Sequence, residues 1–242
     1  MGIILLLIAH LFGDFILQTT KTADKKSESR KYFIIHCGIY SFSMMLALVC
    51  FGPIKNVVII FFVISLSHII IDYLRIQILK TSKKTNEFTI FLADQIVHII
   101  IILVCIQFIA GYSFLGNVIK DYLLKFVDSK QLFNILFFVL LYIICTSPAA
   151  VLIKKVFLHF SFQKDTEDLM KSGYYIGILE RIIILTLGLN GEIGAIGFVI
   201  AAKSLARFKQ LEDKQFAEKY LLGTLLSVMI ALICITLGRY FT

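Results

Sequence analysis

Long apolar stretches separated by short polar segments are the dominant pattern along this chain of 242 residues. Each stretch approaches the roughly 20 residues that an α-helix needs to cross a bilayer. The pattern predicts an all-α, polytopic transmembrane helix bundle with about eight membrane helices, over residues 2–18, 32–51, 54–75, 88–111, 132–153, 174–189, 193–206 and 219–239. The first, sixth and seventh stretches are short, so we expect tilt or local thinning of the bilayer there.

The segment 112–131 differs from the stretches around it, because Lys120, Asp121, Lys125 and Asp128 stand among aliphatic residues. This mixture is typical of an amphipathic helix that lies in the membrane interface. We therefore expect three parts in the chain: a four-helix membrane module over 1–111, an amphipathic connector over 112–131, and a C-terminal four-helix membrane module over 132–242.

Composition favours a membrane protein. Hydrophobic residues make up 59% of the chain and the mean hydropathy is +0.89, well above the values of soluble domains. The first apolar stretch has no basic segment before it and no small-residue cleavage site after it, so we expect it to remain as a helix rather than to act as a signal peptide. The five cysteines form no CxxC pair, which argues against a disulfide framework or a zinc finger.

The distribution of lysine and arginine predicts an orientation. The loops at 19–31, 75–87, 154–171 and 207–219 carry 17 of the 24 basic residues. By the positive-inside rule these loops face the cytoplasm, so both termini of this multi-pass protein lie outside the cell membrane. The net charge of +8 follows from this topology and from attraction to anionic membrane lipid, and we expect no nucleic-acid partner.

Three apolar stretches each contain a histidine and an aspartate four residues apart. The pairs are His10 with Asp14, His68 with Asp72, and Asp94 with His98, and His36 is a further embedded histidine. The spacing places both members of a pair on one face of a helix. Ionisable groups inside a membrane are costly and usually functional. Counted from the predicted cytoplasmic helix ends, all seven lie in the inner half of the membrane.

Imidazole and carboxylate together suit a transition metal. Zinc is the first candidate, with manganese or iron as alternatives, whereas calcium and magnesium prefer oxygen alone. The seven side chains could serve one ion with supporting hydrogen bonds, or two ions that share a bridging carboxylate. Two other interpretations stay open: histidine–aspartate pairs that only join helices, and a proton relay.

The second half of the chain has its own embedded charges. Glu180 and Arg181 lie in the sixth stretch, and Lys203 and Arg207 lie near the end of the seventh. They could form an intramembrane salt bridge, with Arg207 reaching to the interface, or a clamp for a phosphate or carboxylate headgroup. In the second case Glu180 could be a further metal ligand or a general base. The spacing of Gly173 and Gly177 permits a tight hairpin or a homo-oligomer.

A family resemblance is carried by Ala9–Gln18, His36, Ser67–Asp72 and Asp94–His98. These residues resemble a bacterial integral-membrane family catalogued only as domain of unknown function 3307, over about residues 1–110. That family is distantly similar to inner-membrane proteins called membrane-bound metal-dependent hydrolases. The resemblance implies a bacterial inner-membrane location and a metal-ligand role for His10, Asp14, His36, His68, Asp72, Asp94 and His98.

Together these observations favour a metal-dependent hydrolase that acts on a lipid ester or phosphoester at the cytoplasmic leaflet. Asp14 or Asp94 would be the general base, and Lys203 or Arg207 would stabilise the developing negative charge. Gln18, Gln95 and Arg181 complete the predicted substrate-binding set. Two alternatives are a metal-ion or proton-coupled transporter, and a non-catalytic interaction protein that a metal ion stabilises.

Overall fold

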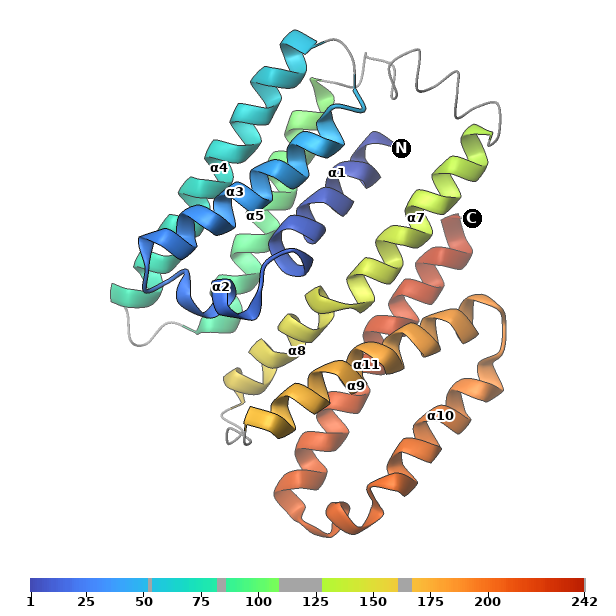
Figure 1. The fold of residues 1–242 in the computed structure, drawn as a ribbon. Helices are drawn as coiled ribbons and strands as arrows, with labels where there is room; N and C mark the ends of the chain where they lie inside the picture. The colour runs from blue at the N-terminus through green and yellow to red at the C-terminus, as the bar shows by residue number, and fades with distance from the viewer. Residues whose placement is uncertain (52–53, 82–85, 109–127, 161–166, 242) are drawn as a thin grey trace. The chain divides into compact units, whose positions relative to one another are not determined.

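The computed structural model describes residues 1–51, 54–81, 86–108, 128–160 and 167–241, and every regular element among them is a helix (Figure 1). The all-α prediction is therefore confirmed for these residues. Most of the predicted amphipathic connector over 112–131 lies outside them. The chain divides into two compact units, Met1–Leu140 and Leu141–Thr242. The predicted division into two modules and a connector stays a prediction.

The described elements, in chain order, are all helical. They are α1 Gly2–Leu11, the π-helix η1 Phe12–Ile16, α2 Thr20–Lys25, α3 Arg30–Leu48, α4 Ile54–Thr81, α5 Glu87–Gln107, α7 Ser129–Cys145, α8 Ser147–His159, α9 Glu167–Leu189, α10 Ile193–Ala206, the 3-10 helix η2 Phe208–Glu212, and α11 Lys214–Phe241.

Five helical segments of the described residues are long and apolar enough to cross a membrane: Arg30–Leu48, Val57–Thr81, Glu87–Gln107, Ser129–His159 and Lys214–Phe241. Two shorter apolar helices, Gly2–Ile16 and Ile193–Ala206, and helix α9 occupy the other three predicted stretches. Large apolar side chains cover the outer surface of these helices, as with Ile59, Phe62 and Ile70 on α4, each more than half exposed. Such a surface is suited to lipid, and the chain is a membrane protein.

The first unit packs α1, α3, α4 and α5 around one core. Helix α1 contacts α3 and α5, and α4 contacts the same two helices. The apolar part of the core is a cluster formed by Leu6, Ala9, Tyr40, Met44, Ala47, Leu48, Phe51, Ile60, Ile64, Ile102 and Cys105. The short helix α2 packs against α3, and its first turn is capped by the Thr19 hydroxyl, which accepts a hydrogen bond from the backbone N–H of Thr22.

The inward face of α4 explains how polar groups enter this core. Buried residues recur at every fourth position: Ile60, Ile64, His68, Asp72 and Ile76. Residues four apart lie on one helix face, so the histidine and the aspartate continue the stripe that the isoleucines begin. Helix α5 has a similar buried stripe, with steps of three or four residues, formed by Phe91, Asp94, His98, Ile102 and Cys105.

In the second unit the predicted continuous helix over 132–153 is interrupted. Helix α7 ends at Cys145 and α8 begins at Ser147, with Thr146 outside the helical region at φ −88° and ψ −125°. Pro148, in the first turn of α8, causes the break, because it has no N–H to donate to the preceding turn and its ring crowds that turn. The break leaves the carbonyl group of Cys145 without a helical partner, whereas the Thr146 carbonyl accepts a hydrogen bond from the Ala150 N–H at 3.2 Å.

Arg181 of α9 donates hydrogen bonds to both of these carbonyl groups. Its Nε donates to the Cys145 oxygen at 2.7 Å, its Nη2 to the Thr146 oxygen at 3.2 Å, and its Nη1 to the Ser227 hydroxyl of α11 at 3.1 Å. The side chain is fully buried. One guanidinium group therefore joins the helix break, α9 and α11.

Candidate metal centre

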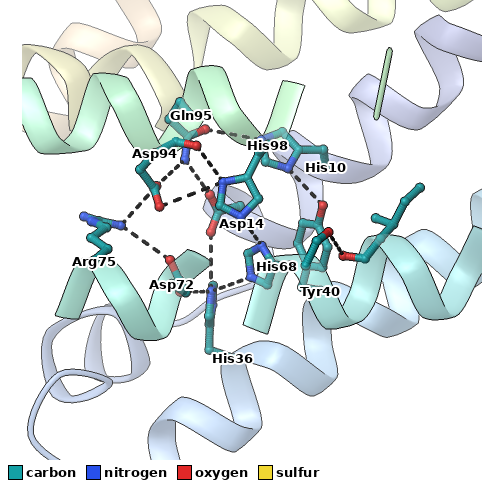
Figure 2. A network of polar contacts seen from close by, with 12 residues as sticks. His10, Asp14, His36, Tyr40, His68, Asp72, Arg75, Asp94, Gln95 and His98 are labelled. Carbon is teal, nitrogen blue, oxygen red and sulfur yellow. Dashed lines mark hydrogen bonds and ion pairs between the residues drawn. The ribbon is translucent and has the colours of Figure 1, made fainter. Parts of the chain in front are cut away.

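The seven predicted metal-site residues gather at one end of the first unit (Figure 2). This is where α1 passes into η1, α3 begins, α4 approaches its end, and α5 begins. All seven side chains are buried, and hydrogen bonds or ion pairs join them in one network: His10, Asp14, His36, His68, Asp72, Asp94 and His98.

Asp14, His36 and His68 form the centre of this network. Their candidate ligand atoms all lie within 4.8 Å of one another. The His36 Nε2 atom lies 3.2 Å from His68 Nε2, 3.5 Å from Asp14 Oδ1 and 2.9 Å from Asp72 Oδ2. Two imidazole nitrogens bound to one tetrahedral zinc ion at the usual bond lengths lie about 3.3 Å apart. The buried group of Asp14, His36 and His68 therefore has the spacing to hold a metal ion.

A chain of hydrogen bonds fixes the orientation of His68. The His98 Nδ1–H donates to the backbone carbonyl of Asp94 at 2.8 Å, so the neutral ring has a lone pair on Nε2. The His68 Nδ1–H donates to that atom at 2.8 Å. Its own Nε2 is then left with a lone pair directed at His36. Metal-binding histidines are commonly held in this way, through a hydrogen bond from the second ring nitrogen.

A second chain holds Asp14. The Tyr40 hydroxyl donates to His10 Nδ1 at 3.3 Å, and the His10 Nε2–H donates to the Gln95 side-chain oxygen at 3.2 Å. The Gln95 amide then donates to Asp14 Oδ2 at 3.0 Å and to Asp94 Oδ2 at 3.1 Å. Oδ1 of Asp14 is left to face His36. His10 thus contacts Gln95 and Tyr40 with its two ring nitrogens rather than joining the central group.

Asp14 lies in a π-helical turn, which the sequence did not reveal. The turn η1 extends the apolar helix α1, and the Leu17 N–H bonds to the Phe12 carbonyl at 2.9 Å. Such turns often occur at functional sites. Gly13 allows the turn to approach α3, because a Cβ atom there would lie 3.1 Å from both Tyr40 Cα and Ser43 Cβ.

Replacing Gly13 by alanine should therefore displace the turn that carries Asp14. We expect the G13A variant to lose about 1–3 kcal/mol of stability through overpacking and to bind metal more weakly. Gly38 on α3 is the matched control, since a Cβ atom added there would meet nothing within 4 Å. G38A should be neutral or more stable by up to about 1 kcal/mol. Thermal unfolding in detergent tests this, and equal effects of the two substitutions would contradict it.

Two cations at the edge of the network were missed by the sequence analysis. Lys26 Nζ donates to Asp72 Oδ2 at 2.7 Å and to His36 Nε2 at 3.1 Å. The Arg75 guanidinium lies 3.4 Å from Asp94 Oδ2 and 3.7 Å from Asp72 Oδ1. Lys26 stands in a basic loop, where its charge indicates only topology. The position of Arg75, three residues after Asp72 on one helix face, was an available signal, as was Tyr40, four residues after His36.

The other predicted substrate-binding residues are divided between the two units. Gln18 follows η1, and its buried Oε1 accepts no hydrogen bond from the described residues. In the second unit Lys203 donates to Glu180 Oε2 at 2.6 Å, which is the predicted salt bridge, and also to the Thr224 hydroxyl at 3.3 Å. Arg207 lies over the Phe216 ring at 5.9 Å. Participation of Glu180, Arg181, Lys203 and Arg207 in a substrate site stays a prediction.

Comparison with known proteins relates the network to a family. Neither the curated proteins nor the solved structures contain a significant match to the chain. The expected similarity to membrane-bound metal-dependent hydrolases therefore stays a prediction. One family matches residues 3–121, the part that carries the whole network, and its description is "Protein of unknown function (DUF3307)". This match covers just under half of the chain, and it makes the N-terminal part of the chain similar to the DUF3307 family.

Proposed function

We propose that this protein is a membrane-embedded, metal-dependent hydrolase that cleaves a lipid ester or phosphoester at the cytoplasmic leaflet. One observation carries the proposal: His36 Nε2, His68 Nε2 and Asp14 Oδ1 converge in a buried group at the end of a bundle of apolar helices. Buried polar atoms of this kind, all able to accept rather than donate, are stabilised by a cation.

Zinc is the metal that this donor set favours, with manganese or iron as alternatives. Asp14, His36 and His68 would hold it, and Asp72, 2.9 Å from His36, is the natural fourth side chain. A divalent ion held there would supply Lewis acidity and lower the pKa of water toward neutral. The number of ions, one or two, depends on whether Asp94 and His98 also bind metal.

Asp94 is the best placed general base. Its Oδ2 atom is held by the Gln95 amide at 3.1 Å and faces Arg75 at 3.4 Å. Its buried Oδ1 atom accepts no hydrogen bond from the described residues. A carboxylate with one oxygen anchored and one oxygen available is suited to take a proton from water. Asp14, by contrast, belongs to the metal-binding group.

The proposed location rests on charge and topology. The network lies at the same end of the first unit as the basic segment 19–31 and the basic end of α4. By the positive-inside rule this end faces the cytoplasm, in a bacterial inner membrane, with eight crossings and both termini outside. A site buried among membrane helices at this depth favours a substrate that is itself anchored in the inner leaflet.

The apolar core of the first unit supports an enzyme rather than a transporter. Toward the opposite end of the unit the described core is the cluster around Leu6, Met44, Leu48, Ile60 and Ile102. A path for metal ions or protons would need polar groups along it, and this cluster offers an apolar barrier instead. Flux of protons or zinc into proteoliposomes would favour the transporter.

Hydrolysis of lipid phosphoesters tests the proposal. We expect the purified, zinc-loaded protein to release product from a panel of short-chain phospholipids, and to lose this activity on chelation and recover it with metal. Asp94→Asn should reduce the turnover number by about 100-fold or more without loss of bound metal. Activity that is insensitive to chelators, or equal in the Asp94→Asn variant, would contradict the assignment.

A further inference from the structure

The charges around the candidate metal centre do not balance. Three carboxylates, Asp14, Asp72 and Asp94, are nearly fully buried, with side-chain exposures of 5, 1 and 2%. The only cations in contact with them in the described part of the chain are Lys26 and Arg75. With the four histidines neutral, as metal binding requires, the cluster carries one negative charge. Adding one divalent ion would make it one positive charge.

A buried net positive charge favours an anionic partner. The two cations are placed to receive one, because their side chains are more exposed than the carboxylates, at 11% for Lys26 and 17% for Arg75. The two cations therefore lie on the side of the network that is nearest to the molecular surface. A neutral carboxylic ester would leave this charge unmatched, whereas a phosphate group would match it.

The Asp72 carboxylate lies between the two cations and shows how they hold an oxyanion. Lys26 Nζ lies 2.7 Å from Asp72 Oδ2, and Arg75 Nη1 lies 3.7 Å from Asp72 Oδ1. Each cation thus faces a different oxygen of a single two-oxygen group. A phosphate group presents similarly spaced oxygens, and lysine and arginine are the usual residues that bind it.

Metal binding and the Lys26 ammonium use the same lone pairs. Lys26 donates to His36 Nε2 at 3.1 Å as well as to Asp72. A divalent ion bound by these two side chains would compete with the ammonium group for them. Lys26 would then be left beside a positive centre, with its hydrogen-bond donors available to a ligand.

We propose that Lys26 and Arg75 form a phosphate-binding subsite beside the metal centre, so that the substrate is a phosphoester and not a neutral ester. This inference rests on the proposed function and narrows its substrate class. The phosphate could belong to a lipid headgroup or to a free phosphate compound, and binding experiments separate these two sources.

Calorimetric titration of the zinc-loaded protein in detergent tests the subsite, with inorganic phosphate and dihexanoyl phosphatidic acid as probes. We expect inorganic phosphate to bind the zinc-loaded wild type at least about tenfold more tightly than the chelator-treated protein. Lys26→Gln and Arg75→Gln should each weaken this binding about tenfold or more, because each removes one charged hydrogen-bond donor. Lys25→Gln, an exposed neighbour of Lys26, should leave it unchanged.

The zinc content of every variant should also be measured, because it distinguishes a failure of the phosphate subsite from a failure of the metal centre. Lys26→Gln should retain zinc or bind it more tightly, since a competing cation is removed, and this also reports that the variant is folded. Zinc without phosphate binding in the wild type, or phosphate binding equal in all variants, would overturn the subsite and leave the metal centre intact. A wild type that binds no zinc would overturn both. Tighter binding of the phosphatidic acid than of inorganic phosphate would identify a lipid headgroup.

Discussion

Replacement of His68 by glutamine is expected to weaken zinc binding by at least about 100-fold. The side chain lies at the centre of the network, and its Nε2 lone pair is directed at His36 by the hydrogen bond that its Nδ1 donates to His98. Glutamine is of similar size but offers only an amide. Because loss of a group that merely orients a ligand already reduces metal affinity about 10- to 100-fold, loss of a ligand should cost more. Competition with a fluorescent zinc chelator measures the affinity.

Two further histidine variants test whether the loss of zinc binding is specific to the His68 position. His98→Gln removes the acceptor of the His68 hydrogen bond and should weaken zinc binding by about 10- to 100-fold. His159→Gln, at the exposed end of α8 in the second unit, should bind zinc like the wild type. If His68→Gln retained wild-type affinity while folded, His68 would not be a ligand.

Replacement of Arg181 by leucine is expected to cause the largest loss of stability in the second unit. It would leave the carbonyl groups of Cys145 and Thr146 and the Ser227 hydroxyl without the hydrogen bonds that Arg181 donates. The Thr146 carbonyl keeps its hydrogen bond from the Ala150 N–H, but each of the other two buried groups left unpaired costs about 1–3 kcal/mol, so we expect a total loss of about 3 kcal/mol. For a chain of this size that lowers the unfolding temperature by roughly 6–12 °C.

Cysteine labelling provides the measurement for Arg181. Cys145 and Cys234 are free and buried in the same unit, so a thiol-reactive dye reports their exposure as the protein is heated. Arg181→Lys should be nearly as unstable as the leucine variant, since lysine lacks the planar fork that reaches all three acceptors. Arg239→Gln, at an exposed position on α11, should unfold like the wild type. Equal unfolding temperatures for all three variants would show that Arg181 does not stabilise the helix break.

Helix periodicity predicts those parts of the site in which two polar side chains share one helix. The pairs His68 with Asp72 and Asp94 with His98 share a helix face by their spacing alone, and the apolar residues on the same stripe, such as Ile64 and Ile102, show which face is buried. Ionisable groups inside apolar membrane helices cost free energy and are usually functional, so their presence predicts one shared site. The structure brings these side chains together at one end of the first unit.

The remaining features depend on contacts between segments that are distant in sequence. Lys26 reaches Asp72 from a loop, and its position in a basic segment suggested only membrane topology. The π-turn that carries Asp14 depends on the close approach of Gly13 to α3. The helix break before Pro148 could have been predicted from that proline, but its satisfaction by Arg181, 36 residues from Cys145, could not.

Metal content of the wild-type protein tests the central claim most directly. The protein should be purified in detergent without chelators and analysed by inductively coupled plasma mass spectrometry beside Asp14→Asn and His36→Gln. We expect close to one or two equivalents of zinc, manganese or iron in the wild type, and strongly reduced metal in both variants. A folded wild type that carries no transition metal, and takes up none when zinc is added, would contradict the claim.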